Sequence, residues 1–348
     1  MPKRLPVTLV TGFLGSGKTT LLRYLLKHSH KKLAVMVNEF GSIGLDGDLF
    51  RSCGFCSQDE LEGRLVELNN GCLCCTVQED FLPTMETLLS RSIELDGILI
   101  ETSGLALPEP LIRALLWPSI RSKVHINGVV TVVDGAALEA GSPIGDISTV
   151  EKQRLEDENI DHLTSLDDLF SNQLAYADLV LISRADCISP YSLKKIELEL
   201  SSKARSATPI IPIINGEINP SIVLGLDQQN NFDFSIEEEH DHDHVHVNVI
   251  SSTLRLEIAL DKHDLERVLS DLVVQYKIIR LKGRCWLPTK TVPLQVQMVG
   301  PRLDTWFEKI PETSWQPKQY GIEFVILSLK KGAKEAITSA LHEKFSLK

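Results

Sequence analysis

The chain has 348 residues, 43% of them hydrophobic and 24% charged, so it can bury a substantial core and is long enough for two or three domains. Its formal net charge of −11 argues against a broad nucleic-acid-binding face, which would need clustered Lys and Arg to displace counterions. No apolar run approaches the ~20 residues that cross a bilayer, and the start lacks the pattern of a secretory signal, so we expect a cytoplasmic protein without a membrane partner.

A phosphate-binding loop is predicted near the start of the chain. A strand at residues 5–11 leads into GFLGSGKTT at residues 12–20 and then into a helical apolar pattern, which is G-x-x-x-x-G-K-[ST] in its required context. Glycines let backbone N–H groups converge on phosphate oxygens, and the helix start adds its positive dipole end. We expect Lys18 to bridge the outer phosphates and the Thr19 hydroxyl to bind Mg²⁺. The predicted nucleotide contacts are Gly12, Gly15, Ser16, Gly17, Lys18, Thr19 and Thr20.

Aliphatic runs recur through the first 225 residues, with helical stretches between most of them. The runs are continuous rather than alternating, which is typical of parallel strands that are covered on both faces. After the first strand they lie at residues 33–38, 65–68, 97–101, 128–134, 179–182 and 210–214. The sequence therefore predicts an α/β fold, with a P-loop NTPase domain on a mostly parallel sheet.

Three thiols, Cys72, Cys74 and Cys75, lie within four positions of a short turn. In a reducing compartment, clustered cysteines are metal ligands or reactive thiols rather than disulfides. Thiolates favour soft or borderline ions such as Co²⁺ or Zn²⁺, and three on one short turn cannot all approach one ion without strain. Redox sensing and inert packing are the alternatives to metal binding.

The roles of the four remaining cysteines are less constrained by their spacing. Cys53 and Cys56, taken with the thiols downstream, approximate a structural zinc site with four thiolate ligands, although the spacing of the second pair differs by one residue. A static zinc site, auxiliary ligands and a loop feature are therefore open readings for this pair. Cys187 and Cys285 are isolated, and we interpret them as structural.

The strand ending at Glu101 continues into Thr102, Ser103 and Gly104. This places a carboxylate and a glycine where a nucleotide switch senses the γ-phosphate. We predict that Glu101 is the second Mg²⁺ contact, direct or through water. A solvated glutamate at a strand end is the alternative.

Base recognition is predicted from Ser183, Arg184 and Asp186, which follow a later strand. Guanine-specific P-loop proteins usually carry Asn-Lys-x-Asp there. Asp186 keeps the carboxylate that accepts from guanine N1–H and the exocyclic amine, whereas Ser183 loses an amide and Arg184 keeps a long stem and a cation that can stack on the base. Asn215, beside Gly216 after the last strand, lies where a backbone contact to the base is often supplied. GTP is therefore the favoured nucleotide.

The second half of the chain contains a linker and a smaller domain. The acidic linker, residues 226–248, carries His240, His242, His244 and His246 at alternate positions; it suits either a weak, pH-dependent trap for divalent ions or a solvated connection. Strands are predicted at 249–260, 276–286, 292–299 and 321–329, and helices at 262–274 and 334–344. We expect domains at 1–225, 226–248 and 249–348, the last of them α+β.

Four motifs in order make the chain similar to the CobW family of P-loop GTPases and metallochaperones, and within it to the branch associated with cobalamin synthesis. They are the P-loop, NEFG at residues 38–41, NGCLCC at 70–75 and ETSG at 101–104. The resemblance covers most of residues 5–220. It implies that the three thiols capture a transition metal when Mg-GTP is bound and release it on hydrolysis. Glu39 is our predicted fourth ligand, and the family's loop implies that Asp46 orients the attacking water or lies near Mg²⁺; a solvated turn aspartate is the alternative.

The function implied is a slow GTPase that delivers cobalt to a metal-receiving protein, such as the cobaltochelatase of corrin synthesis. No arginine finger or water-positioning glutamine is evident, which predicts low intrinsic turnover. Zinc and nickel chaperones share these motifs, and ligand softness does not separate Co²⁺ from Zn²⁺. A nucleotide-ordered metal store or thiol sensor without catalysis is the alternative from another class. A P-loop kinase would need an acceptor pocket and a lid.

Overall fold

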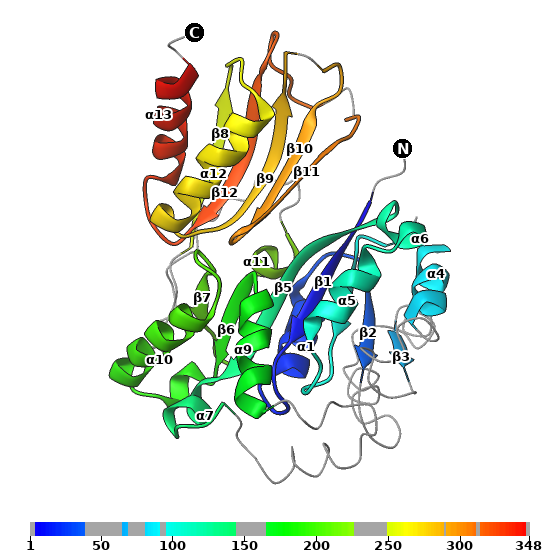
Figure 1. Cartoon of the computed structure of the whole chain (residues 1–348), viewed down its shortest axis with the longest axis vertical. Helices are drawn as coiled ribbons and strands as arrows, with labels where there is room; N and C mark the ends of the chain where they lie inside the picture. Colours follow the sequence, from blue (N-terminus) through cyan, green and yellow to red (C-terminus); the bar gives the residue numbers. More distant parts are fainter. Residues whose placement is uncertain are drawn as a thin grey trace. The chain divides into compact units, whose positions relative to one another are not determined.

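The computed structural model describes residues 4–38, 65–68, 81–90, 95–143, 165–225, 249–288, 290–310 and 314–345. It divides into two compact units, Pro2–Arg205 with Ile210–Leu224, and Ser206–Pro209 with Gly225–Lys348. Both units are drawn in Figure 1. Within the described ranges, no helix is both long and apolar enough to cross a membrane.

The P-loop unit is built on a seven-stranded sheet in which every pairing is parallel. This confirms the predicted α/β fold, and the strands match the predicted aliphatic runs closely except that β5 begins at Val124 rather than Gly128. The strand order is β3-β2-β4-β1-β5-β6-β7. Their bounds are β1 (Leu5–Thr11), β2 (Leu33–Asn38), β3 (Leu65–Leu68), β4 (Gly97–Glu101), β5 (Val124–Asp134), β6 (Leu179–Ser183) and β7 (Ile210–Pro212).

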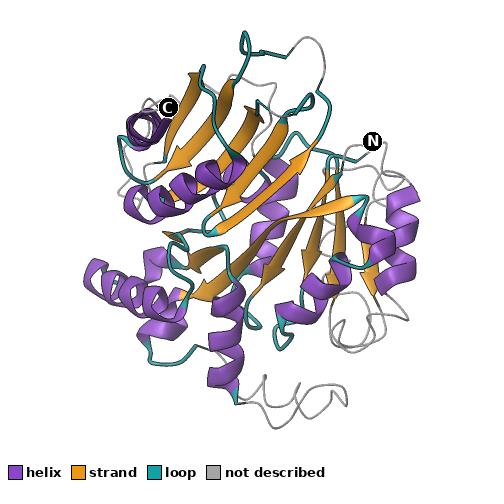
Figure 2. Cartoon of the chain, turned by 45° about the horizontal axis from the view of Figure 1, so that its top comes forward, coloured by secondary structure: helices purple, strands orange, loops and turns teal. Residues whose placement is uncertain are grey.

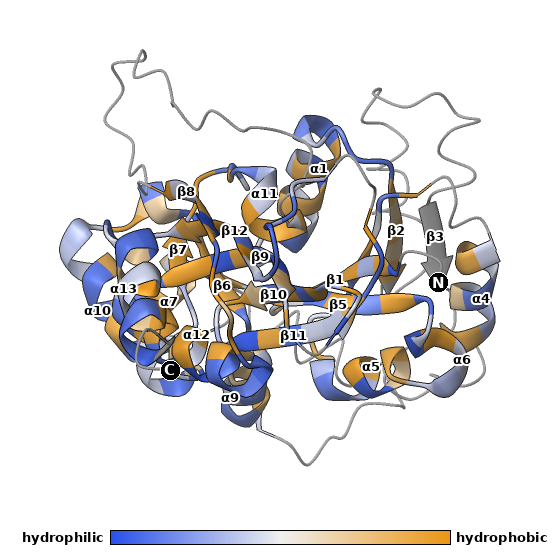
Figure 3. Ribbon diagram, turned by 90° about the horizontal axis from the view of Figure 1, so that it is seen from above, coloured by the Kyte–Doolittle hydropathy of each residue, from blue (hydrophilic) through white to orange (hydrophobic). Residues whose placement is uncertain are grey.

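Amphipathic helices cover this sheet, and Figure 2 shows them in front of it and behind it. In Figure 3, α1 and α5 each carry hydrophobic and hydrophilic residues, as expected for helices with one face on a core. Val7 and Leu9 of β1, for example, share a buried cluster with Met85 of α4 and Leu111 of α5. The helices are α1 (Lys18–His28), α4 (Leu82–Ser90), α5 (Pro108–Leu115), α6 (Pro118–Arg121), α7 (Gly135–Glu139), α9 (Leu166–Tyr176), α10 (Pro190–Lys203) and α11 (Pro220–Leu224), with a 3-10 turn η3 (Ala185–Cys187).

The strand order predicts where a ligand binds. Strands β4, β2 and β3 lie on one side of β1, whereas β5, β6 and β7 extend the sheet on the other side of β1. In open parallel sheets, ligands bind beyond the carboxyl ends of the strands at such a reversal. The P-loop follows the end of β1, and Val10 near that end pairs in register with Glu101 at the end of β4. The topology therefore brings both predicted motifs to one edge of the sheet.

Strand β5 contains one extra residue. Val7 pairs with Ile126 and Thr8 pairs with Gly128, so Asn127 is a β-bulge that the register skips. The buried Asn127 amide donates to Thr8 Oγ1 at 2.7 Å and to a backbone carbonyl of α11 at 3.1 Å. The polar residue interrupts the aliphatic run, which explains why the sequence predicted a strand only after it.

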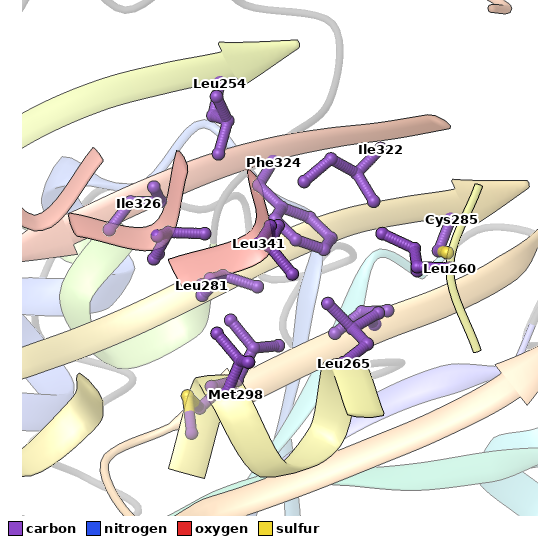
Figure 4. Close-up of a cluster of buried hydrophobic side chains, with 14 of the residues drawn as sticks. Leu254, Leu260, Leu265, Leu281, Cys285, Met298, Ile322, Phe324, Ile326 and Leu341 are labelled. Atoms are coloured by element: carbon purple, nitrogen blue, oxygen red, sulfur yellow. The ribbon is translucent and has the colours of Figure 1, made fainter. Parts of the chain in front are cut away.

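The second unit is an antiparallel five-stranded sheet of order β11-β10-β9-β12-β8 with two helices packed on it. Figure 4 shows the core, where Leu265 of α12 and Leu341 of α13 meet Leu281, Met298 and Phe324 of the strands. Side chains of both helices join one cluster, so they share one face of the sheet, as expected for an α+β unit. The bounds are β8 (Ile250–Leu256), α12 (Lys262–Tyr276), β9 (Ile278–Trp286), β10 (Leu294–Val299), β11 (Arg302–Phe307), β12 (Gly321–Ser328) and α13 (Ala333–Phe345).

One strand of this sheet, β11, was not predicted. Among the described strands it lies at the edge of the sheet, next to β10. Its residues from Arg302 to Trp306 are all partly exposed and Phe307 is exposed, so no buried face imposes an alternation on the sequence.

Candidate functional site

The P-loop backbone requires glycine at its first position. Gly12 has φ +135°, and a Cβ there would collide with the Val132 carbonyl oxygen of the neighbouring strand. Gly15 and Gly17 also have positive φ. The loop therefore takes a conformation that brings its backbone close to β5 and turns directly into α1.

The start of α1 carries the predicted phosphate-binding residues. Lys18 is buried, and its Nζ donates to the Phe13 carbonyl at 3.0 Å, so the side chain folds back across the loop. Ser16 is buried beneath the loop, whereas Thr20 is exposed on the first turn. The helix has no side-chain cap at Gly17 and no acidic residue in its first turn. In this arrangement, terminal N–H groups and the helix dipole bind anions.

Thr19 and Glu101 come together although 82 positions separate them. Thr19 Oγ1 donates to Glu101 Oε1 at 3.3 Å, and Glu101 is only 4% exposed. A buried carboxylate is costly unless a cation or hydrogen bonds compensate for its lost hydration. A hydroxyl and a carboxylate at this distance are both ligand types that Mg²⁺ takes, so the pair fits the predicted metal.

Three buried hydroxyls surround the same loop without a hydrogen-bond partner among the residues that the structure describes: Thr11 Oγ1, Ser16 Oγ and Thr102 Oγ1. A buried polar group left unsatisfied costs about 1–3 kcal/mol. Oxygen atoms of a phosphate and of metal-bound water would supply the missing partners, so these residues also fit a nucleotide with Mg²⁺.

The loop after Glu101 rests directly on the P-loop. A Cβ on Gly104 would lie 2.5 Å from Leu14 N and 3.1 Å from Phe13 C. Only a residue without a side chain allows this approach of two backbones. The two loops therefore form one continuous surface at the carboxyl ends of β1 and β4.

The strand that precedes the predicted base-binding residues is tied to the P-loop. Ser183 Oγ lies 2.7 Å from the Ser16 carbonyl and 3.1 Å from the Val133 carbonyl, to either of which it can donate. The sequence alone treated Ser183 as the loss of an amide. In the structure the hydroxyl links β6 to the phosphate-binding loop.

Arg184 is held by a residue that sequence reasoning missed. Its Nε donates to Asp134 Oδ1 at 2.8 Å, and a guanidinium N–H group forms an ion pair with Asp134 Oδ2. The carboxylate also caps α7 by accepting from Ala136 N and Ala137 N at 3.0 and 3.2 Å. An Asp at a strand end immediately before a helix start was the available signal. The bidentate pair fixes the Arg184 stem while half of the side chain remains exposed.

The two base-side loops are joined to each other and to α1. Ala185 N donates to the Ile213 carbonyl at 3.3 Å, and a Cβ on Gly216 would lie 2.9 Å from the Thr20 carbonyl. Asp186 is exposed in η3, and Asn215 is exposed with φ 51°. The described residues that were predicted to contact the nucleotide thus all lie at one end of the sheet.

Several predicted site residues lie outside the described residues: Glu39, Asp46, Cys53, Cys56, Cys72, Cys74, Cys75, His240, His242, His244 and His246. Within the part of the chain that is described, no group of three His, Cys, Asp or Glu side chains could hold a metal ion. Cys285 is buried in the second unit, as the structural interpretation expects, and burial raises the pKa of its thiol to about 12. Cys187 is exposed, so burial does not support the structural interpretation for that residue.

Comparison with protein families matches both units. Residues 6–212 match the model described as the CobW/HypB/UreG nucleotide-binding domain. Residues 249–344 match the model described as the cobalamin synthesis protein cobW C-terminal domain.

The chain is also similar to individual proteins. A zinc chaperone CobW of Pseudomonas aeruginosa is 42% identical over 312 residues, which cover 88% of this chain and 83% of the relative. A zinc chaperone CobW of a Sinorhizobium species is 38% identical over 349 residues, covering 97% and 96%. Among solved structures, the Zn(II)-bound YjiA GTPase from Escherichia coli is 20% identical, with 98% and 99% of the two chains covered and a TM-score of 0.41.

Proposed function

Since the chain belongs to the CobW/HypB/UreG family of P-loop GTPases, we propose that it is a metallochaperone whose GTP hydrolysis controls the release of Zn²⁺. The observation that carries the nucleotide half of this proposal is the Thr19 and Glu101 pair, with 3.3 Å between its oxygens at the edge of the P-loop. The register of β1 with β4 brings the P-loop to the end of β4, and the first turn of α1 then carries Thr19 to Glu101; such preorganisation favours phosphoryl transfer.

Lys18 supplies the charge that acts on the phosphates. In the present conformation its ammonium donates to the neutral carbonyl of Phe13. An anionic phosphate oxygen is a stronger acceptor than a carbonyl, so Lys18 exchanges the first partner for the second when GTP binds. Mg²⁺, held by Thr19 and Glu101, would neutralise charge on the β- and γ-phosphates.

Guanine selection is assigned to Asp186 and Arg184. The exposed Asp186 carboxylate can accept two hydrogen bonds from guanine, whereas adenine offers no matching pair of donors. The guanidinium of Arg184, anchored by Asp134, provides a planar cation that stacks on a base. Gly216 approaches the backbone of α1 closely, so the neighbouring Asn215 lies near the helix that follows the P-loop.

Zn²⁺ is favoured over the Co²⁺ that the family resemblance implied. Two relatives that align over most of the chain are both named zinc chaperones. Thiolate ligands are compatible with either ion, so the names of the relatives, rather than ligand chemistry, support this choice. Zn²⁺ is here a cargo that the protein would pass to a metal-receiving protein.

Strand register supports Glu39 as a ligand beside the thiols. Asn38 at the end of β2 pairs with Leu68 at the end of β3. Glu39 follows the first of these positions directly, and Cys72 follows the second by four residues. Val37 of β2 also pairs with Glu101. We therefore propose that Cys72, Cys74, Cys75 and Glu39 bind the cargo metal next to the strand that carries the Mg²⁺ ligand, with Asp46 near the hydrolytic water and the linker histidines as weak auxiliary ligands.

The coupling is tested by equilibrium Zn²⁺ titration of the protein without nucleotide, with GDP and with a non-hydrolysable GTP analogue. We expect the tightest binding with the analogue. Lys18→Ala should lose the effect of the analogue and keep its fold, whereas Cys74→Ser with Cys75→Ser should lose Zn²⁺ and keep GTP. Equal Zn²⁺ affinity in all three nucleotide states would refute the coupling.

The enzymatic part has a separate test. Single-turnover release of phosphate from Mg-GTP, with and without Zn²⁺, distinguishes a GTPase from a metal store that nucleotide only orders. A rate no higher than that of Lys18→Ala would leave the store as the better description.

A further inference from the structure

A buried glutamine outside the nucleotide motifs contacts the loop that follows Glu101. Gln173 lies on α9 and is 0% exposed. Its Nε2 donates to the Gly104 carbonyl at 3.2 Å and to the Ala106 carbonyl at 3.3 Å. Both partners can only accept, so the amide nitrogen, with its two hydrogens, has to face the loop.

The same residue is held through its main chain. Thr131 Oγ1 of β5 donates to the Gln173 carbonyl at 3.2 Å. The amide oxygen of the side chain, Gln173 Oε1, is buried and has no hydrogen-bond partner in the described part of the chain. An apolar side chain would avoid that cost. The glutamine is therefore poorly explained by packing alone, and its two bonds to the loop are the feature that distinguishes it.

Helix α9 also contacts the P-loop. The ring of Phe170 stacks on Phe13 with 6.0 Å between centroids, and Phe13 supplies the carbonyl that accepts from Lys18. At the end of α9, a hydrogen bond between Tyr176 and Glu109 raises the pKa of the tyrosine and lowers the pKa of the carboxyl group. The helix is thus fastened to α5 while it contacts both nucleotide loops.

The loop after Glu101 is in contact with three elements. Gly104 lies against the P-loop backbone at Leu14. Gln173 of α9 donates to the Gly104 and Ala106 carbonyls, and Thr102 N donates to the Val10 carbonyl of β1 at 2.9 Å. Residues 102–106 are therefore held by β1, the P-loop and α9. Glu101, the last residue of β4, lies immediately before this loop.

We propose that Gln173 is a positioning residue for the Mg²⁺ site: its amide holds residues 104–106 against the P-loop and so keeps Glu101 within reach of Thr19. This inference rests on the proposed GTPase function. The Gln173 amide donates to backbone carbonyls of the loop, so it acts through that backbone.

The test replaces Gln173 with Met, which keeps the length and removes both donors. Asn127→Leu is the matched control, since Asn127 is another buried amide that makes two hydrogen bonds from its nitrogen, to Thr8 and to α11. Two readouts are needed: the Mg²⁺ concentration for half-maximal GTP hydrolysis, and GDP affinity measured in EDTA. For Gln173→Met we expect about a ten-fold rise in the Mg²⁺ requirement, because hydrogen bonds that hold a ligand in place are lost. GDP affinity without Mg²⁺ should stay close to wild type.

The control should melt earlier than wild type and keep the wild-type Mg²⁺ requirement. An unchanged Mg²⁺ requirement in Gln173→Met, or an equal rise in Asn127→Leu, would overturn the proposal. If Gln173→Met does not fold, Gln173→Asn serves instead, since its amide is withdrawn from the carbonyls by one methylene and should give the same rise. Wild-type protein that hydrolyses no GTP would refute the proposed function, a result distinct from failure of this inference.

Discussion

Replacing Gly104 with Ala would test the contact between the two nucleotide loops. The added Cβ would lie 2.5 Å from Leu14 N and 3.1 Å from both Leu14 Cα and Phe13 C, all of them backbone atoms that cannot rotate away. Ordinary contact begins at 3.4 Å, so the loops have to separate by roughly 1 Å. A displacement of that size in a catalytic site costs on the order of 100-fold in rate. Overpacking of this kind also lowers the free energy of unfolding by about 1–3 kcal/mol.

Phosphate release at saturating Mg-GTP measures the first effect, and thermal unfolding without nucleotide measures the second. Gly141→Ala is the matched control: Gly141 has φ +89°, and no atom of the described residues lies within 4 Å of an added Cβ, so we expect alanine there to introduce backbone strain of about 1–2 kcal/mol without a collision. The control should unfold earlier and hydrolyse GTP at the wild-type rate. A Gly104→Ala protein that hydrolyses GTP as fast as the control would refute the argument that this backbone contact positions the site.

Three further predictions follow from the site and from the two described cysteines. Glu101→Gln should raise the Mg²⁺ concentration needed for tight GTP binding and leave Mg²⁺-free GDP binding unchanged, since a neutral amide is a weaker Mg²⁺ ligand than a carboxylate; calorimetric titration in both conditions measures this. Asp186→Asn should reduce GTP affinity by at least about 100-fold and favour xanthosine triphosphate, whose C2 carbonyl matches an amide donor; equal binding of both nucleotides by the wild type would contradict the assignment. Iodoacetamide at pH 8 should alkylate the exposed Cys187 in the native protein but Cys285 only after unfolding, because burial keeps the latter thiol protonated with a pKa of about 12; peptide mass spectrometry distinguishes them.

The fold was largely predictable because its local signals agree with its tertiary structure. Buried parallel strands need unbroken aliphatic runs, and these marked all seven strands of the first sheet. Strand order was not predictable, since a run such as 97–101 is compatible with several neighbours. The edge strand β11 was missed because neither of its faces is fully buried.

The candidate site divides in the same way. Residues within one motif, such as Lys18 and Thr19, could be predicted to lie together because a single loop carries both. Asp134 and Gln173 could not, since their partners lie 50 and 67–69 positions away and only tertiary structure brings them close. A weak signal existed for Gln173, a polar residue between Phe170 and Leu174 on the buried stripe of α9.

The bulge at Asn127 determines which face of the sheet each later residue of β5 occupies. Before it, even-numbered Ile126 faces the same cluster as Val7; beyond it, odd-numbered Val129 takes that side. If Asn127 were instead paired with Thr8 in a regular strand, every later position of β5 would turn to the other face, and the carboxylate of Asp134 would point away from its guanidinium partner. The skipped residue thus keeps Asp134 on the side of β5 where it pairs with Arg184.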